Sequence, residues 1–169
     1  NIKKYVMIPA FASSRHKYIE ERLLKLVDYN NKSGLNKIYP AEDGNSNSRI
    51  KTGIITSGAA FNYAKDIIKD TDILKLGMTY PLPSELIKEF CRNKERIIVI
   101  EELDGFIEEE LLKLRLDIRI DGKNLISNVG ELTPERLAKY LGVSKFISIS
   151  VKFDVPIPPR PPILCAGCP

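Results

Sequence analysis

The chain has 169 residues, of which 43% are hydrophobic and 28% are charged, and its formal net charge is +4. This length and composition are typical of one globular domain with extensions, large enough to bury a core. The small net charge, without any basic–aromatic cluster, argues against a nucleic-acid-binding protein. No apolar run has the length of a membrane span and no signal-peptide pattern is present, so we expect a cytoplasmic protein with no membrane partner.

Residues 1–50 are predicted to form an N-terminal linker that contains one amphipathic helix. The helix is expected to begin at Ser13 or Ser14, after a short apolar stretch ended by Pro9, and to run to about Asn31. Its apolar residues recur at helical spacing, at Ile19, Leu23, Leu26 and Val27. A single stripe of this kind predicts a helix that lies on another surface.

Two further features of this region are predicted to be structural. His16, the only histidine, has no second histidine or cysteine pair near it in the sequence, which favours a surface residue over a catalytic one. Residues 30–49 are polar and rich in turn-forming residues, and this composition predicts a linker or a mobile connection.

Residues 51–150 alternate short apolar runs with helical patterns, which predicts an α/β domain. Strands are expected at 53–56, 73–76, 96–100 and 117–120. Arg96–Ile100 is the most continuous of these runs, as expected of a parallel strand covered on both faces. The last helix is expected to have Thr133 as its cap and to end at Gly142. Such repeated units predict a three-layer α/β/α sandwich with a mostly parallel sheet.

The run Ile73–Pro83 combines a strand, Gly77 and two prolines before the next helix. Pro81 restricts the residue before it to extended conformations, so a stiff turn is predicted at the carboxyl end of the strand. Ligands and partner domains usually bind at that edge of an open α/β sheet. We therefore predict an interface there that involves Met78, Tyr80, Pro81 and Leu82, with an ordinary strand–helix loop as the alternative.

Two motifs lie at the same predicted edge. Thr56-Ser57-Gly58 connects a strand to a helix, where backbone amides can bind an anion, but a plain tight turn fits it better because the phosphate-loop glycine patterns are absent. Glu101 and Glu102 follow the third strand. They are expected to face opposite sides, so that at most one enters a site, and a role at the start of the next helix or at an interface is favoured over catalysis. Asp104 is the predicted cap of that next helix.

The C-terminal residues 151–169 are predicted to form a proline-rich tether that leads into a further, missing domain. Cys165 and Cys168 near its end have the spacing of half a zinc or iron–sulfur site, which supplies two ligands of four. Cys91 is expected to be buried in a helix. The start at Asn1 and the stop at Pro169 predict that the chain is a piece of a longer polypeptide.

Several motifs together resemble one enzyme family. They are Gly53-Ile-Ile-Thr-Ser-Gly58, Leu74-Lys-Leu-Gly-Met-Thr-Tyr-Pro-Leu-Pro83, Ile98-Val-Ile-Glu-Glu-Leu103, Gly130-Glu-Leu132 and Pro161-Pro-Ile-Leu-Cys-Ala-Gly-Cys-Pro169. In this order they are similar to indolepyruvate ferredoxin oxidoreductase alpha subunits, which are thiamine-dependent 2-oxoacid:ferredoxin oxidoreductases. The resemblance extends from Tyr5 to Pro169 and places the chain in the transketolase C-terminal-like domain of such a subunit.

The resemblance implies what the intact enzyme does. An aryl 2-oxoacid is oxidatively decarboxylated on thiamine diphosphate with Mg²⁺, electrons pass through [4Fe-4S] clusters to ferredoxin, and coenzyme A takes the acyl group. It also implies contacts with the thiamine-binding domains of the same subunit and with a beta subunit. Relatives have Cys-Pro-Gly-Cys-Pro-His-Arg at the end of this segment, from which Ala166 departs, and metal ligation by Cys165 and Cys168 is implied only in the intact parent.

We therefore expect a scaffolding and interface domain that has no catalytic residue of its own and binds no cofactor alone. The alternatives are a stand-alone α/β module that binds a small molecule or nucleotide, and a pure subunit-interaction module. Visible absorbance from iron–sulfur clusters in the parent polypeptide would distinguish the first interpretation from a stand-alone binding module.

Overall fold

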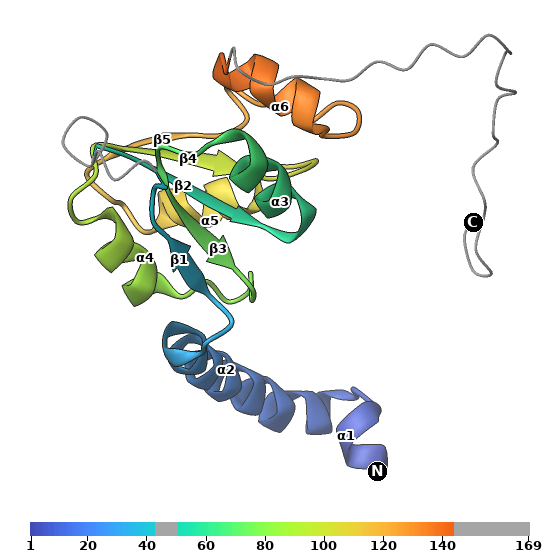
Figure 1. Cartoon of the computed structure of the whole chain (residues 1–169). Helices are drawn as coiled ribbons and strands as arrows, with labels where there is room; N and C mark the ends of the chain where they lie inside the picture. The colour runs from blue at the N-terminus through green and yellow to red at the C-terminus, as the bar shows by residue number, and fades with distance from the viewer. Residues whose placement is uncertain (43–50, 144–169) are drawn as a thin grey trace, which may run out of the picture.

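The alternating segments build one five-stranded sheet in the computed structural model, which describes residues 1–42 and 51–143 (Figure 1). The strands are β1 (Lys37–Tyr39), β2 (Thr52–Ser57), β3 (Asp72–Leu76), β4 (Arg96–Ile100) and β5 (Arg119–Asp121). Their order across the sheet is β1-β3-β2-β4-β5, and β1 alone is antiparallel to its neighbour. The predicted α/β fold with a mostly parallel sheet is confirmed.

Helices cover both faces of the sheet and make two cores. Helices α3 (Gly58–Ile67) and α6 (Pro134–Leu141) pack on one face, and α4 (Ser84–Cys91) and α5 (Phe106–Lys113) pack on the other. Because side chains alternate along a strand, Ile54 belongs to the first core and Ile55 to the second. This arrangement explains the nearly continuous apolar run of β4, whose residues must fill both cores.

The ends of α6 are those predicted from the sequence. The Thr133 hydroxyl oxygen accepts a hydrogen bond from the backbone N–H of Arg136 at 3.4 Å, and Pro134 occupies the first turn. Gly142 follows the helix with a φ of 66°, a left-handed conformation that glycine adopts without steric cost.

The N-terminal region differs from the prediction in where its helix starts. A short helix, α1 (Ile2–Tyr5), is followed by α2 (Pro9–Lys32), which begins before Ser13 and Ser14. Pro9 starts α2 because its missing N–H is no loss in the first turn of a helix. Figure 1 shows that α2 projects from the α/β body. Despite the length of α2, no helix in the described ranges is apolar enough to cross a membrane.

The prediction of a linker or mobile connection over 30–49 is wrong for its first part. Residues 37–39 form β1, which pairs with β3 along three residues, and Asn30 and Asn36 are buried. The pairing was missed because three residues at a sheet edge bury few side chains and leave a weak pattern. Residues 43–50 and the predicted tether at 151–169 lie outside the described residues, so the proposed domain boundaries remain predictions.

The amino-terminal edge of the sheet is closed by an ion pair. Lys94 Nζ lies 2.8 Å from a carboxylate oxygen of Asp72, and the lysine side chain is only 6% exposed. A Cβ at residue 53 would lie 2.5 Å from Cδ of Lys94, so Gly53 leaves room for the lysine to cross β2. Burial raises the pKa of Asp72, but hydrogen bonds from Lys94 and from the backbone of Ala41 outweigh it and lower that pKa. The cavity described below lies at the opposite, carboxyl-terminal edge.

Candidate functional site

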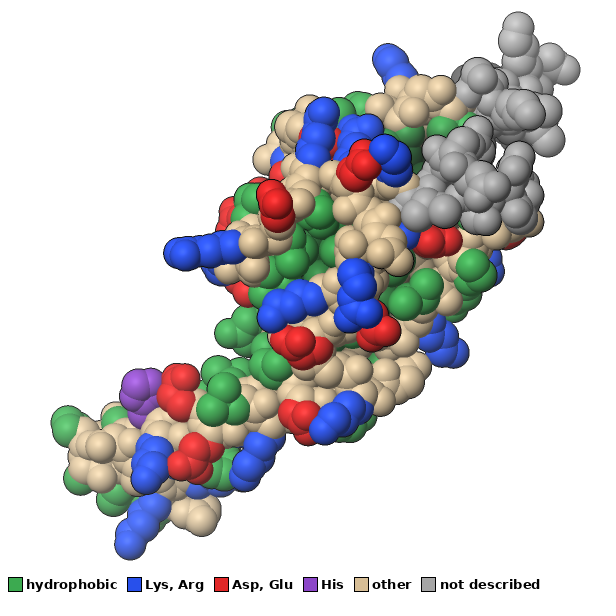
Figure 2. Space-filling view, turned by 90° about the vertical axis from the view of Figure 1, so that its left-hand side faces the viewer, with side chains coloured by type: hydrophobic (Ala, Val, Ile, Leu, Met, Phe, Trp, Pro, Cys, Tyr) green, Lys and Arg blue, Asp and Glu red, His purple; other side chains and the backbone are tan. Residues whose placement is uncertain are grey.

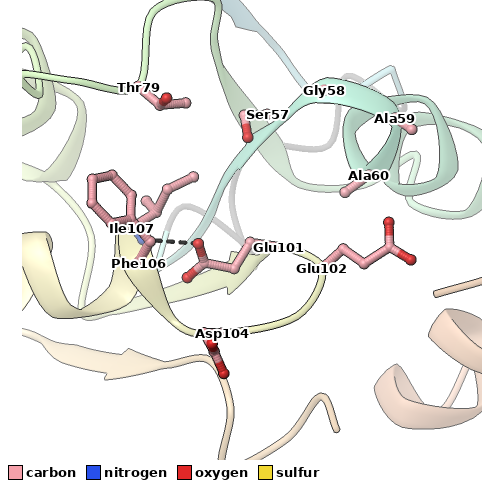
Figure 3. Close-up of a pocket in the computed structure, with 10 residues that line it drawn as sticks. All are labelled: Ser57, Gly58, Ala59, Ala60, Thr79, Glu101, Glu102, Asp104, Phe106 and Ile107. Carbon is pink, nitrogen blue, oxygen red and sulfur yellow. Dashed lines mark hydrogen bonds between the residues drawn. The ribbon is translucent and has the colours of Figure 1, made fainter. Parts of the chain in front are cut away.

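A cavity of about 310 Å³ lies at the carboxyl-terminal edge of the sheet. The connection after β2 leads to β3, on one side of β2 in the sheet. The connection after β3 returns past β2 to β4, on the other side. The point between β2 and β4 is therefore the topological switch point, where α/β proteins usually bind ligands. The cavity is lined by Ser57, Gly58, Ala59, Ala60, Thr79, Glu101, Glu102, Asp104, Phe106 and Ile107 (Figure 3).

Glu101 caps α5 from outside that helix. Its side-chain oxygens accept hydrogen bonds from the backbone N–H groups of Ile107 at 2.8 Å and Glu108 at 3.0 Å, and the residue is only 8% exposed. Burial raises the pKa of this carboxyl, and the two backbone N–H donors partly offset the increase. Because both oxygens are already bound by the helix, the predicted role of Glu101 at the start of the helix agrees with its position.

Asp104 does not cap α5, contrary to the sequence prediction. The residue that immediately precedes the helix is Gly105, and no side chain at that position makes a capping hydrogen bond. Capping rules examine the residues just before a helix, whereas here the carboxylate comes from the end of β4. Asp104 is exposed and lines the cavity.

Both Glu101 and Glu102 line the cavity, which corrects the expectation that at most one would enter a site. The alternation of side chains does not apply to this pair because β4 ends at Ile100. Figure 3 shows the two carboxylates pointing in different directions. Glu102 accepts a hydrogen bond from the backbone N–H of Leu132 at 3.0 Å. The two groups are therefore engaged by different parts of the chain.

The turn at Thr56-Ser57-Gly58 joins β2 directly to α3. Thr56 is buried and its hydroxyl donates to the backbone oxygen of Ile100 at 2.7 Å, which fixes the end of β2 against β4. Gly58 has a φ of 55°, a value favoured by glycine. The first turn of α3 has no side-chain cap and faces a cavity lined by carboxylates. An anion there would be repelled, so the tight-turn interpretation is favoured.

The loop Gly77–Pro83 has one exposed and one buried side. Tyr80 is 56% exposed and its ring centroid lies 6.1 Å from that of Phe106, which is 45% exposed. Leu82, by contrast, is 7% exposed and belongs to the core under α4 and α5. Leu82 is therefore a core residue instead of an interface residue, because the loop turns inward after Pro81. Met78 and Pro81 are half-buried.

Two buried asparagines fix this loop to the end of α2, and neither was predicted from the sequence. The side-chain amide of Asn30 donates to the backbone oxygens of Met78 at 2.9 Å and Pro81 at 2.8 Å. Asn36 donates to both oxygens of Asn30 and accepts from the backbone N–H of Gly77 at 3.0 Å. A buried amide with all these partners is well satisfied, and α2 and the loop are held as one unit.

Gly77 is required by the same junction. A Cβ added at this position would lie 2.4 Å from the backbone oxygen of Leu35, so any other residue would push β1 and the loop apart. Leu35 lies in the turn between α2 and β1.

Neither Cys91 nor His16 lines the cavity. Cys91 is 4% exposed, and burial raises its pKa to about 11, which keeps it a neutral thiol at pH 7. His16 is exposed on α2, where it pairs with Glu20. Cys165 and Cys168 lie outside the described residues. In residues 1–42 and 51–143, no group of three or more His, Cys, Asp or Glu side chains is arranged to hold a metal ion.

Comparisons with known proteins give similar sequences over the whole chain. Indolepyruvate oxidoreductase subunit IorA from Methanothermobacter thermautotrophicus is 35% identical over 179 aligned residues, which cover 99% of this chain. The subunit of the same name from Pyrococcus horikoshii is 36% identical over 188 aligned residues, covering 100% of this chain. The chain spans 28% of the length of each of these relatives. No protein-family model matches it.

One of the solved structures that match this chain shares its fold at low sequence identity. It is a 2-oxoglutarate:ferredoxin oxidoreductase from Magnetococcus marinus, determined with 2-oxoglutarate, coenzyme A and succinyl-CoA bound. The match has a TM-score of 0.52 and 14% identity, and it covers 80% of this chain and 23% of that one. At this identity the likeness supports the fold.

Proposed function

Since this chain is homologous along its whole length to one segment of indolepyruvate oxidoreductase subunit IorA, we propose that it is a non-catalytic domain of a 2-oxoacid:ferredoxin oxidoreductase. The observation that carries the proposal is the 32–36% identity of six such subunits over 97–100% of the chain. In the proposed enzyme, an aryl 2-oxoacid is converted to acyl-CoA and ferredoxin is reduced, in the cytoplasm. This segment holds other domains in place.

The described residues do not fit the cofactors that this reaction needs. Three carboxylates, those of Glu101, Glu102 and Asp104, line the cavity at the switch point, and its lining contains no cation. Such a site repels the diphosphate group of thiamine diphosphate. Cys91 is a buried, protonated thiol, and cluster ligands are thiolates. We therefore assign thiamine diphosphate, Mg²⁺ and [4Fe-4S] binding to other parts of the parent polypeptide.

The carboxyl-terminal edge supports a structural role. Glu101 holds α5, Glu102 holds the segment before α6, and both asparagines hold the loop Gly77–Pro83. These hydrogen bonds fix the backbone around an exposed aromatic pair, Tyr80 and Phe106. Aromatic residues are enriched at interfaces, and a rigid surface loses little entropy on docking. The partners we propose there are the thiamine-binding domains of the same subunit and the beta subunit.

The test compares the 169-residue chain with the parent polypeptide assembled with its partner subunit. We expect the assembly to reduce ferredoxin when given indolepyruvate and coenzyme A, and to absorb in the visible range. The 169-residue chain, supplied with thiamine diphosphate and Mg²⁺, should not decarboxylate indolepyruvate. Decarboxylation by the short chain would contradict the non-catalytic role, and an assembly inert to all 2-oxoacids would contradict the activity.

The cavity favours one alternative, a module that binds a small molecule at the switch point. That alternative predicts a parent polypeptide without iron–sulfur absorbance and a compound that protects the short chain against thermal unfolding. A cationic compound would be the first choice for such a screen because the lining is acidic.

A further inference from the structure

Helix α2 has an apolar stripe that continues into the candidate interface. Ile19, Leu23, Leu26 and Val27 lie on one side of α2, and Asn30 follows on the same side, three turns after Ile19. Asn30 is the residue that binds the loop Gly77–Pro83. The stripe and the loop are therefore neighbouring parts of one surface.

The described part of the chain covers this stripe only in part. Of the 24 residues of α2 only Asn30 is buried, and α4 is the body helix that α2 contacts. Ile19 is 40% exposed, and Leu23, Leu26 and Val27 are half-buried. Figure 2 shows apolar side chains along the projecting arm and near its junction with the body. Helices in proteins owe most of their stability to packing of an apolar face, so α2 needs a partner.

The orientation of α2 is fixed before any partner binds. Asn36 and Asn30 join the end of α2 to the loop by buried hydrogen bonds, and Asn31 accepts from the backbone N–H groups of Glu85 at 3.0 Å and Leu86 at 3.3 Å. Asn31 thus also ties α2 to the first turn of α4. A helix held at both of these points presents its stripe at a set angle to the sheet edge.

We propose that the α2 stripe and the exposed side of the loop Gly77–Pro83 form one docking surface for another domain of the same polypeptide. This inference rests on the proposed function. The relatives align over all or nearly all of this chain, yet it spans 28% of their length, so most of such a polypeptide lies outside this segment. A domain joined by the chain itself has a high effective concentration at this surface, which favours it over a separate molecule.

The test is hydrogen–deuterium exchange of α2 in three samples: the 169-residue chain, the parent polypeptide alone, and the parent with its partner subunit. We expect the backbone amides of α2 to exchange roughly tenfold more slowly, or slower still, once the rest of the parent polypeptide is present. Protection in the short chain, from a second copy or from its own remaining residues, would overturn the proposal. So would protection that appears only when the partner subunit is added.

Two variants distinguish the effect of losing the stripe side chains from a general effect of substitution on helix α2. In the parent polypeptide, the double substitution Ile19→Ala with Leu23→Ala should return α2 exchange toward that of the short chain. Leu24→Ala is the matched control, since Leu24 is 73% exposed and lies off the stripe. Alanine preserves helix propensity, and unchanged exchange in β2 and β4 would exclude unfolding of the body. Equal effects of the two variants would overturn the proposal.

This result and the enzymatic assay can fail independently. A parent polypeptide that is active on 2-oxoacids but leaves α2 unprotected would refute the docking surface alone. Protected α2 in a polypeptide with no 2-oxoacid activity would refute the proposed function alone.

Discussion

Helices α2 and α4 contact each other but are stabilised in different ways. The eight residues of α4 bury Ile87, Phe90 and Cys91 in a core, whereas the 24 residues of α2 bury only Asn30. Helix α4 is held by apolar packing within the chain, and α2 is held at one end by hydrogen bonds to backbone atoms. Helix α4 therefore has its apolar face buried within this chain, whereas the apolar face of α2 is left available for the proposed docking partner.

The core beneath α4 is where a substitution should have its largest effect. Val99 is 1% exposed and lies opposite Ile55 in the centre of the sheet. Val99→Asp buries an unpaired charge, which costs several kcal/mol, about the whole stability of such a domain. We expect loss of the cooperative thermal transition, measured by circular dichroism. Val129→Asp, at a valine that is 73% exposed, is the matched control and should melt like the wild type. A cooperatively folded Val99→Asp variant would contradict the assigned core.

A substitution at the junction between α2 and the body should lower the stability less than Val99→Asp does. Asn36→Ala removes the acceptor for the N–H of Gly77 and two hydrogen bonds to Asn30, and leaving buried polar groups unpaired costs about 1–3 kcal/mol. Urea unfolding should show this loss, and exchange at residues 77–81 should increase. The control is Asn128→Ala, at an exposed position. Equal stability of the two variants would mean that the asparagine network does not hold the loop.

The contrast between the two helices also explains what the sequence could predict. Strand β4 was predicted at Arg96–Ile100, where it lies, because a strand buried on both faces must be apolar throughout. Helix α6 was predicted from Thr133, Pro134 and Gly142, whose roles are local. Both features depend on residues close together in the chain.

Features that depend on distant residues were missed. Strand β1 has only three residues, and their partners in β3 lie 34 to 38 positions further along the chain. The sequence of β1 alone is too short to show a strand period. Asn30 and Asn36 are buried by tertiary hydrogen bonds, whereas their neighbourhood has the composition of a turn. The candidate site could be placed at the carboxyl ends of the predicted strands, but the directions of its carboxylates could not be predicted.

The capping of α5 gives a smaller and pH-dependent effect. Glu101→Ala removes the acceptor for two backbone N–H groups and should cost about 1 kcal/mol. Asp104→Ala, at the residue that local rules favour, should change stability little because Gly105 is the residue that precedes α5 and the N–H groups of its first turn donate to Glu101. Equal costs for the two variants would contradict the assignment of the cap to Glu101.

The sign of the pH dependence follows from the raised pKa of Glu101. Burial lifts this pKa above the ordinary value of 4.5, so the unfolded chain loses its proton first as the pH rises. The contribution of Glu101 to stability therefore decreases as the pH rises from 4.5 through the folded-state pKa. The difference in unfolding free energy between wild type and Glu101→Ala should shrink over that range. A difference that grows with pH would show that the folded-state pKa is not raised.

The exposed side of the loop Gly77–Pro83 should give the smallest effect on the chain itself. Tyr80 is 56% exposed and its described ring contact is with Phe106, so Tyr80→Ala should cost less than about 1 kcal/mol, the usual value of an aromatic pair. Leu82→Ala, two residues away, should cost about 2–5 kcal/mol because it truncates a core residue. In the parent enzyme, by contrast, Tyr80→Ala should weaken assembly or activity. The melting temperature of the 169-residue chain should stay nearly unchanged. Destabilisation of the short chain by about 2 kcal/mol or more would instead place Tyr80 in this domain's own core and remove it from the interface.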